Sequence, residues 1–445
     1  MPPKITIRAL DEPPLPILQG SRSDQRYNSE VALGQPEASM TTYVRAWPCL
    51  AGRGSGPDNR VGAHWAYAKT PANESDNGAR LMITVSRRKL IKRTSLACLG
   101  SLIGTKAASP RQAPAAGGTP GFEPAHNQSP KAAKSKRDLM LEVLNMESKP
   151  GYVPAGFFMH FGVRGDAAVK AHLDYFHGTG MDFVKIQFDE QTLPPANQVQ
   201  RPEDWARIPV LPAAWFEPSL YLLKSLIREA KSEALIIQTL YSPYQMAKQA
   251  VPVKLLLEHV AQDPDSVCRG MENITLSLLH FVEAAARAGL DGFYMCTQGG
   301  ETNHIADRGL FNRTVKTYDM LLYKEVSQLT SYNIMHVCDY EGSYEDFVPR
   351  FHDYPGQVVN VPLSADGKPL SLGQAAEIFK RPVMGGLNRL GIVSTGSPEE
   401  VRKAALEVLK DAPPNVILGA DCTVSAKTPI ENLRTAIRTA HEYRT

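Results

Sequence analysis

The chain has 445 residues, 43% hydrophobic and 21% charged, which is enough for one large globular domain with extensions. Its 49 basic and 46 acidic side chains give a net charge of +3, which argues against nucleic acid or an anionic membrane as the partner. Six cysteines are too few for a disulfide-stabilised scaffold.

The first part of the chain, residues 1–81, has neither helical nor strand periodicity. Stretches such as residues 11–16 and 52–57 are rich in proline and glycine, which is typical of loops. We expect this segment to be disordered. A related interpretation is that translation begins at Met82 and that residues 1–81 are a mis-assigned upstream extension.

Residues 82–135 have the order of an export signal followed by a linker. A basic segment with two adjacent arginines, residues 86–92, precedes an apolar stretch, residues 94–105, and an alanine-rich region. The apolar stretch is too short to span a membrane. The pattern predicts export by the twin-arginine route to the periplasm or the extracellular space. The alternative is a chance basic cluster in a cytoplasmic protein.

From Lys136 to the C-terminus, short apolar runs alternate with amphipathic segments of helical spacing. The eight runs are residues 155–161, 183–188, 234–240, 292–297, 333–339, 358–363, 382–388 and 415–421. The amphipathic segments are residues 167–179, 219–231, 271–288, 312–329, 343–352, 372–379, 398–410 and 429–443. This alternation predicts an α/β fold, a (β/α)8 TIM barrel over residues 136–445. An open doubly wound sheet has the same alternation, but no Gly-x-Gly-x-x-Gly follows the first run to support nucleotide binding.

Two of the helical segments carry start signals. Ser397 and Thr428 are each followed by proline and, at the third position, by Glu400 and Glu431. This is the spacing of a capping box with proline in the first turn. We therefore expect helices to begin at these two positions.

The carboxyl ends of the strands carry the chemistry of a TIM barrel, because the loops that follow them form the site. This rule selects side chains from several runs, which we expect at one mouth. They are His160, Gln187, Asp189, Tyr241, Cys296 to Gln298, His336, Cys338, Asn360, Asn388, Asp421 and Cys422.

Three of these residues, His336, Cys338 and Cys422, form a metal-ligand pattern. His336 and Cys338 are two apart on a predicted strand and therefore share a face. The two thiols are 84 residues apart, far beyond zinc-finger spacing, so only a closed fold brings them together. Zinc favours sulfur and imidazole ligands, and three protein ligands leave one position open for substrate or water.

Several segments resemble the uroporphyrinogen decarboxylase (URO-D) superfamily. Residues 152–162 and 180–185 resemble its first two strands, and residues 288–292 resemble the approach to its fourth. Residues 382–388 stand where the family has a Gly-Asn-Leu-Asp-Pro strand, and residues 418–443 resemble its end. The superfamily includes haem-pathway decarboxylases and zinc methyltransferases that move a methyl group from a corrinoid protein to a thiol such as coenzyme M. The resemblance implies the same barrel here.

The decarboxylase branch is the poorer match. Its opening strand carries Met-Arg-Gln-Ala-Gly-Arg, and guanidinium groups are suited to a substrate with eight carboxylates. Here residues 159–163 read Met-His-Phe-Gly-Val, so His160 replaces the first arginine and Arg164 is a loose substitute for the second. Asp189 falls where the family has its essential aspartate, so a general acid–base role remains available there.

The methyltransferase branch is similar in its zinc motif, His-x-Cys after the fifth strand and Cys after the eighth. His336, Cys338 and Cys422 occupy those places. The resemblance implies a Zn²⁺ cofactor that holds a substrate thiol as a nucleophilic thiolate, with a corrinoid on a partner protein as methyl donor. Glu341 would then be a fourth ligand or a base beside the metal, or else an ordinary loop carboxylate.

Other candidates also have simple structural interpretations. Cys268 is typical of a small hydrophobic packing residue. Cys296 ends the predicted strand at residues 292–297 and either joins the site or packs in the core, and we expect the packing role. Asp421 either orients a ligand or caps a loop. Tyr241 and Gln298 are expected to line the pocket.

Three functions follow from these observations. The favoured one is zinc-dependent transfer of a methyl or alkyl group to a thiol. The second is decarboxylation of a tetrapyrrole or smaller acid through Asp189. The third is an exported protein that binds a corrinoid or tetrapyrrole without turnover. In each case the partner is a small molecule, without nucleic acid and without stable membrane insertion.

Overall fold

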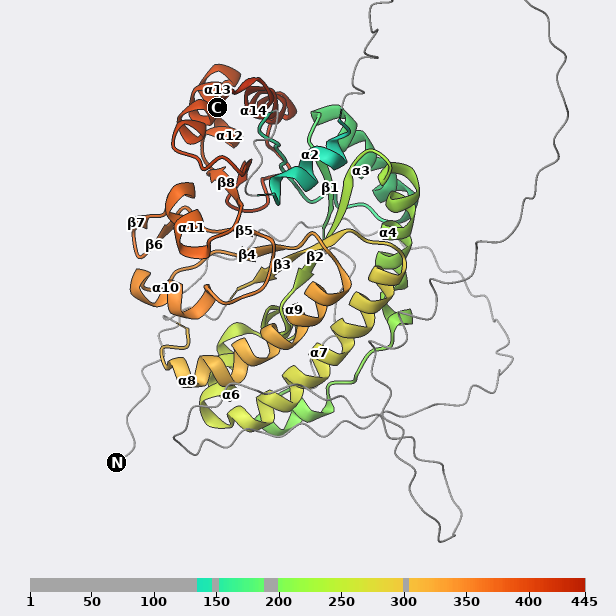
Figure 1. The fold of residues 1–445 in the computed structure, drawn as a ribbon. Helices are drawn as coiled ribbons and strands as arrows, with labels where there is room; N and C mark the ends of the chain where they lie inside the picture. Colours follow the sequence, from blue (N-terminus) through green and yellow to red (C-terminus); the bar gives the residue numbers. More distant parts are fainter. Residues whose placement is uncertain (1–133, 146–151, 188–198, 299–303, 445) are drawn as a thin grey trace, which may run out of the picture. The chain divides into compact units, whose positions relative to one another are not determined.

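The computed structural model describes residues 134–145, 152–187, 199–298 and 304–444. The expectations for residues 1–81 and for the export signal lie outside these residues, and so does Asp189. In the described part, seven parallel strands form one sheet in the order β1-β2-β3-β4-β5-β8-β9 (Figure 1). They are β1 (Phe183–Ile186), β2 (Leu235–Tyr241), β3 (Gly292–Thr297), β4 (Ile334–Val337), β5 (Val358–Asn360), β8 (Val383–Leu387) and β9 (Val416–Ala420). A separate two-stranded sheet pairs β6 (Ser364–Ala365) with β7 (Lys368–Pro369).

Helices connect these strands and pack around the curled sheet (Figure 1). The longer ones are α2 (Lys136–Val143), α3 (Gly165–Thr179), α4 (Glu217–Ala230), α5 (Pro243–Ala250), α6 (Val253–Gln262), α7 (Pro264–Arg287), α9 (Thr317–Leu329), α10 (Tyr344–Phe351), α11 (Leu372–Phe379), α13 (Pro398–Lys410) and α14 (Ile430–Glu442). Short turns are η1 (Pro202–Arg207), η2 (Ala213–Phe216), α8 (Arg308–Phe311), η3 (Asn312–Lys316) and α12 (Ile392–Thr395). Every predicted helical segment overlaps one of these helices, whereas α2, α5 and α6 were not predicted.

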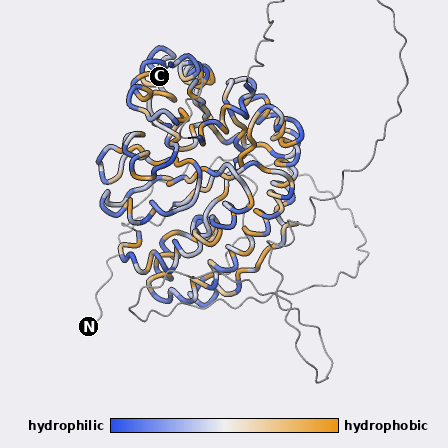
Figure 2. Tube along the Cα trace, in the orientation of Figure 1, coloured by the Kyte–Doolittle hydropathy of each residue, from blue (hydrophilic) through white to orange (hydrophobic). Residues whose placement is uncertain are grey.

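Amphipathic spacing explains why the helices lie where they do. Hydrophobic and hydrophilic stretches alternate along the helical parts of the chain (Figure 2). In α7 the buried residues Met271, Ile274, Leu278, Phe281 and Ala285 recur every three or four positions and so form one apolar stripe. No helix in the described ranges combines the length and the apolar character needed to cross a membrane.

The predicted first strand, residues 155–161, is not a strand in the structure. It is an extended segment with a single bridge, from Ala155 to Leu418 of β9. Gly156 N–H donates to Leu418 O (3.0 Å), and Asp182 N–H, just before β1, donates to Ala155 O (3.0 Å). The segment therefore links the two edges of the sheet and closes the barrel. A regular ladder does not form because Ala155 N–H donates to the Asp182 carboxylate (2.7 Å) instead of a backbone carbonyl.

The barrel has an inner and an outer apolar core. The inner core takes one or two residues from each of the seven strands and so fills the inside of the curled sheet. Its strand residues are Phe183, Leu235, Ile237, Tyr294, Ile334, Val358, Met384 and Ile417. The outer core joins the sheet to the helices. Since side chains alternate along a strand, the residue two positions after each inner-core residue also points inward, nearer the carboxyl end.

The two predicted capping boxes have different outcomes. Ser397 caps α13 as expected, because its side chain accepts from Glu400 N–H and the Glu400 side chain accepts from Ser397 N–H. The prediction for Thr428 was wrong, since α14 begins at Ile430 without a side-chain cap. The Thr428 hydroxyl instead pairs with Ser394 Oγ at 2.6 Å, so a tertiary contact replaces the local one.

A buried carboxylate, Asp319 of α9, lies behind the carboxyl end of β3. Its Oδ2 accepts hydrogen bonds from Thr297 Oγ1 (3.0 Å) and from the Tyr354 hydroxyl (3.0 Å). Its Oδ1 has no hydrogen-bond partner within the described residues. Burial raises the pKa of Asp319 to about 7 because the charged form loses its hydration.

This carboxylate is expected to make stability fall as the pH rises from roughly 5 to 7. In that window the folded carboxyl still binds a proton that the unfolded one has released, so raising the pH costs the folded state about 2 kcal/mol. Asp319→Asn removes this ionisable group, so the free energy of unfolding of the variant should depend less on pH than that of the wild type. Urea unfolding at both pH values measures the difference, with the exposed Glu399→Gln as control. Equal pH dependence in wild type and Asp319→Asn would contradict the prediction.

Candidate metal centre

The carboxyl ends of β3 and β4 place a cysteine and a histidine side by side. Cys296 is the register partner of His336 on the neighbouring parallel strand. Both residues are two positions beyond inner-core residues, Tyr294 and Ile334, so both point into the barrel. Cys338 follows β4 and shares the inward face with His336. The ligand atoms of Cys296, His336 and Cys338 all lie within 4.8 Å of one another, and all three side chains are buried.

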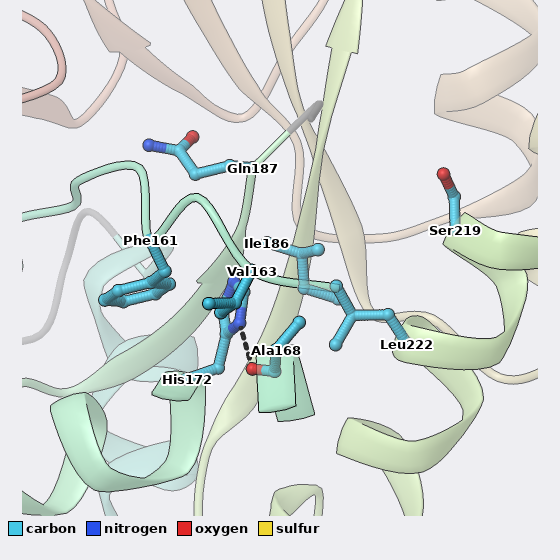
Figure 3. A pocket seen from close by; sticks show the side chains of 8 residues that line it. All are labelled: Phe161, Val163, Ala168, His172, Ile186, Gln187, Ser219 and Leu222. Atoms are coloured by element: carbon cyan, nitrogen blue, oxygen red, sulfur yellow. Dashed lines mark hydrogen bonds between the residues drawn. The ribbon is translucent and has the colours of Figure 1, made fainter. Parts of the chain in front are cut away.

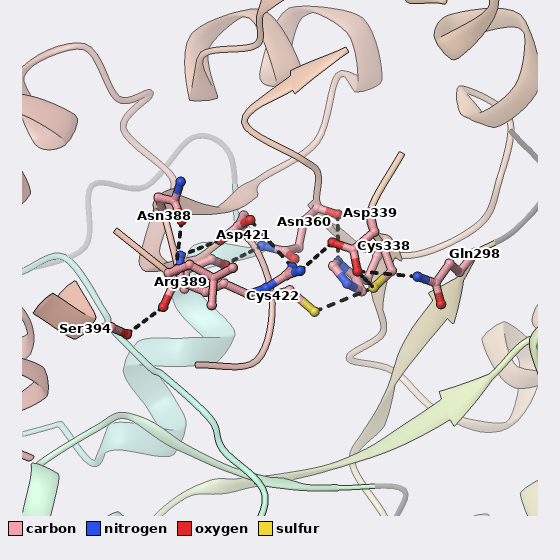
Figure 4. A network of polar contacts seen from close by, with 12 residues as sticks. Gln298, Cys338, Asp339, Asn360, Asn388, Arg389, Ser394, Asp421 and Cys422 are labelled. Carbon is pink, nitrogen blue, oxygen red and sulfur yellow. Dashed lines mark hydrogen bonds and ion pairs between the residues drawn. The ribbon is translucent and has the colours of Figure 1, made fainter. Parts of the chain in front are cut away.

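Cys422 approaches this group from the loop after β9. Its Sγ lies 3.6 Å from Cys338 Sγ (Figure 4). Two thiolates on a tetrahedral zinc, with Zn–S distances of about 2.3 Å, are separated by about 3.8 Å, close to the distance found here. The structure therefore brings His336, Cys338 and Cys422 together as the sequence predicts. It also adds Cys296, for which we expected a packing role.

The thiols influence one another's ionisation. Hydrogen bonding with Cys338 lowers the pKa of Cys296 and holds that of Cys422 well below the usual value. The same contacts raise the pKa of Cys338 well above its usual value. Burial lowers the pKa of His336, but the Cys422 and Cys296 thiolates outweigh it and the net shift is upward. The cluster thus makes Cys296 and Cys422 the thiols that ionise more readily, whereas Cys338 holds its proton more tightly.

His336 is oriented for metal binding. Its Nδ1 lies 3.3 Å from Asn360 O, so donation to this carbonyl leaves the Nε2 lone pair free. Nε2 is buried and has no hydrogen-bond partner of acceptable geometry in the described part of the chain. Such an orphaned polar atom is costly unless a ligand satisfies it. A histidine that donates through one nitrogen and presents the other, among thiols, fits zinc.

Asn360 supports this histidine from β5. Its Oδ1 accepts from the Tyr294 hydroxyl (2.7 Å), and its Nδ2 donates to Met384 O (2.9 Å) and Ala420 O (3.2 Å). Asn360 thus holds His336 in place while its own side chain is hydrogen-bonded within the protein. The prediction from sequence that Asn360 binds substrate stays a prediction.

A charged network surrounds the thiols at the mouth (Figure 4). The Arg389 guanidinium pairs with Asp339 Oδ1 (2.6 Å) and with Asp421 Oδ2 (3.6 Å), and Gln298 Nε2 donates to Asp339 Oδ2 (3.4 Å). Asp421 also accepts from Arg389 N–H at 2.7 Å. Sequence reasoning missed Arg389, although its place after the predicted strand 382–388 was a usable signal.

A second cation, Lys185, lies buried in the barrel and was also missed. Its Nζ is 4.0 Å from the Phe158 ring centroid and 4.5 Å from that of Tyr294, and it donates to Gln187 Oε1 (2.5 Å). Lys185 is two positions beyond the inner-core residue Phe183 and thus points inward. A lysine inside an apolar strand was the signal in the sequence.

The other predicted site residues have varied surroundings. Gln187 Nε2 donates to Thr423 Oγ1 (3.5 Å), and Tyr241 is half-buried beside Cys296 at the end of β2. The side chains of His160, Glu341 and Asn388 are exposed. In the described residues, the group of potential ligands within 4.8 Å of one another contains no carboxylate, so the structure lends no support to Glu341 as a metal ligand. Cys422 is not in this group either, but its Sγ contacts Cys338 Sγ at 3.6 Å.

Gln187 also borders a small cavity beside β1 and α3 (Figure 3). His172 lines the same cavity, and its Nδ1 interacts with Ala168 O at 2.7 Å. The cavity volume of about 10 Å³ holds at most one water molecule, so it is not a substrate pocket.

Comparison with known proteins adds family information. Residues 178–443 match the sequence profile of the family described as Uroporphyrinogen decarboxylase (URO-D). A methyltransferase from Methanosarcina mazei has a similar structure, with a TM-score of 0.58 and 15% identity over 69% of this chain and 98% of that chain. A putative vitamin-B12 independent methionine synthase from Listeria monocytogenes has a TM-score of 0.42 and 12% identity over 66% of this chain and 98% of that chain, too weak a likeness to carry an argument. No curated protein matches the sequence. At these identities the structural likeness shows the fold alone.

Proposed function

The chain belongs to the uroporphyrinogen decarboxylase family, and from that premise we propose that it is a zinc enzyme that transfers a methyl or alkyl group to a thiol. The observation that carries this proposal is that His336 and Cys338 lie together at the carboxyl end of β4 and that Cys422 Sγ, from the loop after β9, lies 3.6 Å from Cys338 Sγ. The fold shared with a methyltransferase is consistent with it.

The protein's own residues have distinct roles in this proposal. His336, Cys338 and Cys422 would hold the metal, with His336 oriented by Asn360. Bound zinc would lower the pKa of a substrate thiol and keep it as a thiolate nucleophile. Arg389 would help to keep Cys422 ionised, because its charge lowers the pKa of that thiol. We propose a small thiol as acceptor and a corrinoid on a partner protein as donor.

The described mouth is poorly suited to a substrate with many carboxylates. Arg389 is already paired with Asp339 and Asp421, so its charge is largely neutralised. His160 is exposed where the decarboxylases have an arginine. Bidentate recognition of carboxylates requires guanidinium groups free to bind them, which favours thiol chemistry over decarboxylation.

Export remains part of the proposal, on the sequence evidence of residues 86–92. The twin-arginine route moves folded proteins, which suits a metal centre assembled before export. A fusion of residues 82–135 to a reporter that is active only outside the cytoplasm would test it, with both arginines replaced by lysine as control.

Metal analysis tests the central proposal. We expect about one zinc per chain in the purified protein, and an affinity lower by more than about 100-fold in Cys422→Ser, because even residues outside the ligand set cost about 10–100-fold. Cys268→Ser is the matched control, since Cys268 lies in α7 and donates to Arg313 O (3.6 Å). Methyl transfer from methylcobalamin to 2-mercaptoethanesulfonate should follow zinc content.

Two outcomes would contradict this proposal. One is a protein without stoichiometric zinc whose activity is unchanged in Cys422→Ser. The other is turnover of uroporphyrinogen to coproporphyrinogen, which would establish decarboxylation instead.

A further inference from the structure

Cys296 lies where a metal ligand would lie, although the zinc motif predicted from the sequence consists of His336, Cys338 and Cys422 alone. It is 4% exposed and lies on β3, in register with His336 of β4. Its Sγ is within 4.8 Å of the ligand atoms of both His336 and Cys338. Two of the three members of this group are therefore held by adjacent paired strands.

The contacts of Cys296 differ from those of a packing cysteine. Its Sγ lies within 4.8 Å of another thiol, that of Cys338, whose Sγ in turn lies 3.6 Å from Cys422 Sγ. The buried Cys268 instead donates to a backbone carbonyl within the helical layer. Cys296 thus forms one compact group with His336 and Cys338, and Cys422 adjoins this group through Cys338. Together they supply three sulfurs and one imidazole, the donor set of a Cys₃His zinc site.

The surrounding charge also suits a third thiolate. Zn²⁺ with three thiolates and a neutral imidazole has one net negative charge, which is costly to bury without a partner. Lys185 supplies a positive charge inside the barrel, held above the rings of Phe158 and Tyr294. The Tyr294 ring in turn lies 4.8 Å from the His336 ring, so that Lys185 is close to the ligand cluster. A site with only two thiolates would be neutral and would not need this cation.

We propose that Cys296 is a fourth protein ligand and that Lys185 balances its charge, so that the resting metal centre is a closed Cys₃His set. This inference rests on the proposed function for the presence of the metal itself. The centre expected from the sequence has three protein ligands and one open position, whereas the centre inferred here has four protein ligands and no open position. A substrate thiol then reaches the metal only when one ligand leaves or the centre accepts a fifth.

X-ray absorption at the zinc edge tests the proposal on the full-length, zinc-loaded protein. We expect three sulfur neighbours in the wild type, two in Cys296→Ala, and three in the matched control Cys268→Ala. Lys185→Met should keep three sulfurs but bind zinc about 10-fold more weakly, the effect of losing a supporting residue. Chelator competition measures this affinity.

The outcomes separate the two proposals. Zinc with two sulfur neighbours in the wild type would overturn the role of Cys296 and leave the proposed function intact. Three sulfur neighbours in both the wild type and Cys296→Ala would also show that Cys296 is not a ligand, and would leave the proposed function intact. A wild type without zinc would overturn both. If Cys296→Ala does not fold, Cys296→Ser replaces it and the wild-type sulfur count still decides.

Discussion

Replacement of Cys338 by alanine is expected to abolish zinc binding and activity while leaving the protein folded. Cys338 is the central member of the cluster, since it contacts both Cys296 and Cys422. Its loss removes one ligand and separates the remaining two thiols. We expect zinc affinity to fall by more than about 100-fold, because changes outside the ligand set already cost about 10–100-fold.

The folding cost of this change should be small. Cys338 is 8% exposed and lies just after β4, so truncation leaves a cavity worth about 1 kcal/mol. Chelator competition and thermal unfolding measure affinity and stability separately, with Cys268→Ala as the matched control. Stoichiometric zinc in Cys338→Ala would contradict the assignment of the centre.

Zinc binding should also weaken as the pH falls. The pKa of Cys338 is raised well above its usual value by its contacts with Cys296 and Cys422. Metal binding must therefore displace its proton, and a higher proton concentration competes with the metal. Chelator competition with the wild-type protein at several pH values measures this dependence, and an affinity that does not change with pH would contradict it.

The largest expected effect on stability comes from Arg350 of α10. Its side chain is fully buried, and its guanidinium donates to Asp346 Oδ2 (Nε 3.0 Å, Nη2 2.9 Å) and to Ile305 O (3.0 Å). It also lies 4.5 Å from the centroid of the Phe311 ring. Arg350→Met leaves Asp346 and the carbonyl without this partner, which should destabilise the fold by about 3–5 kcal/mol.

Arg308 offers a matched control for this prediction. It also pairs with Asp346, but its side chain is 54% exposed, so Arg308→Met should cost less than about 1 kcal/mol. Urea unfolding of both variants gives the comparison. Similar free energies of unfolding would show that burial of the Arg350 guanidinium contributes little.

Much of the candidate centre was accessible from sequence because two simple rules apply to it. Apolar runs alternating with helical segments indicated the barrel, and residues at the carboxyl ends of strands indicated its mouth. His336, Cys338 and Cys422 satisfy both rules, and the structure brings them together. Asp189, proposed on the same rules, lies outside the described residues.

Other features depended on contacts that a single segment does not specify. The run at residues 155–161 has strand composition, but the Asp182 carboxylate takes the Ala155 N–H and leaves one bridge in place of a ladder. Thr428 has capping-box spacing, but its hydroxyl is hydrogen-bonded to that of Ser394, from another segment, and does not cap the helix.

The sequence by itself determined the barrel, its approximate strand and helix positions, and three of the four side chains in the thiol–imidazole cluster. Only the tertiary structure decided that Cys296 joins them and that Lys185 and Arg389 surround them. The physical reason is register. Alternation along one strand tells which residues share a face, but pairing between strands decides whether Cys296 lies level with His336. Closure of the sheet into a barrel likewise determines that Lys185 is buried inside it.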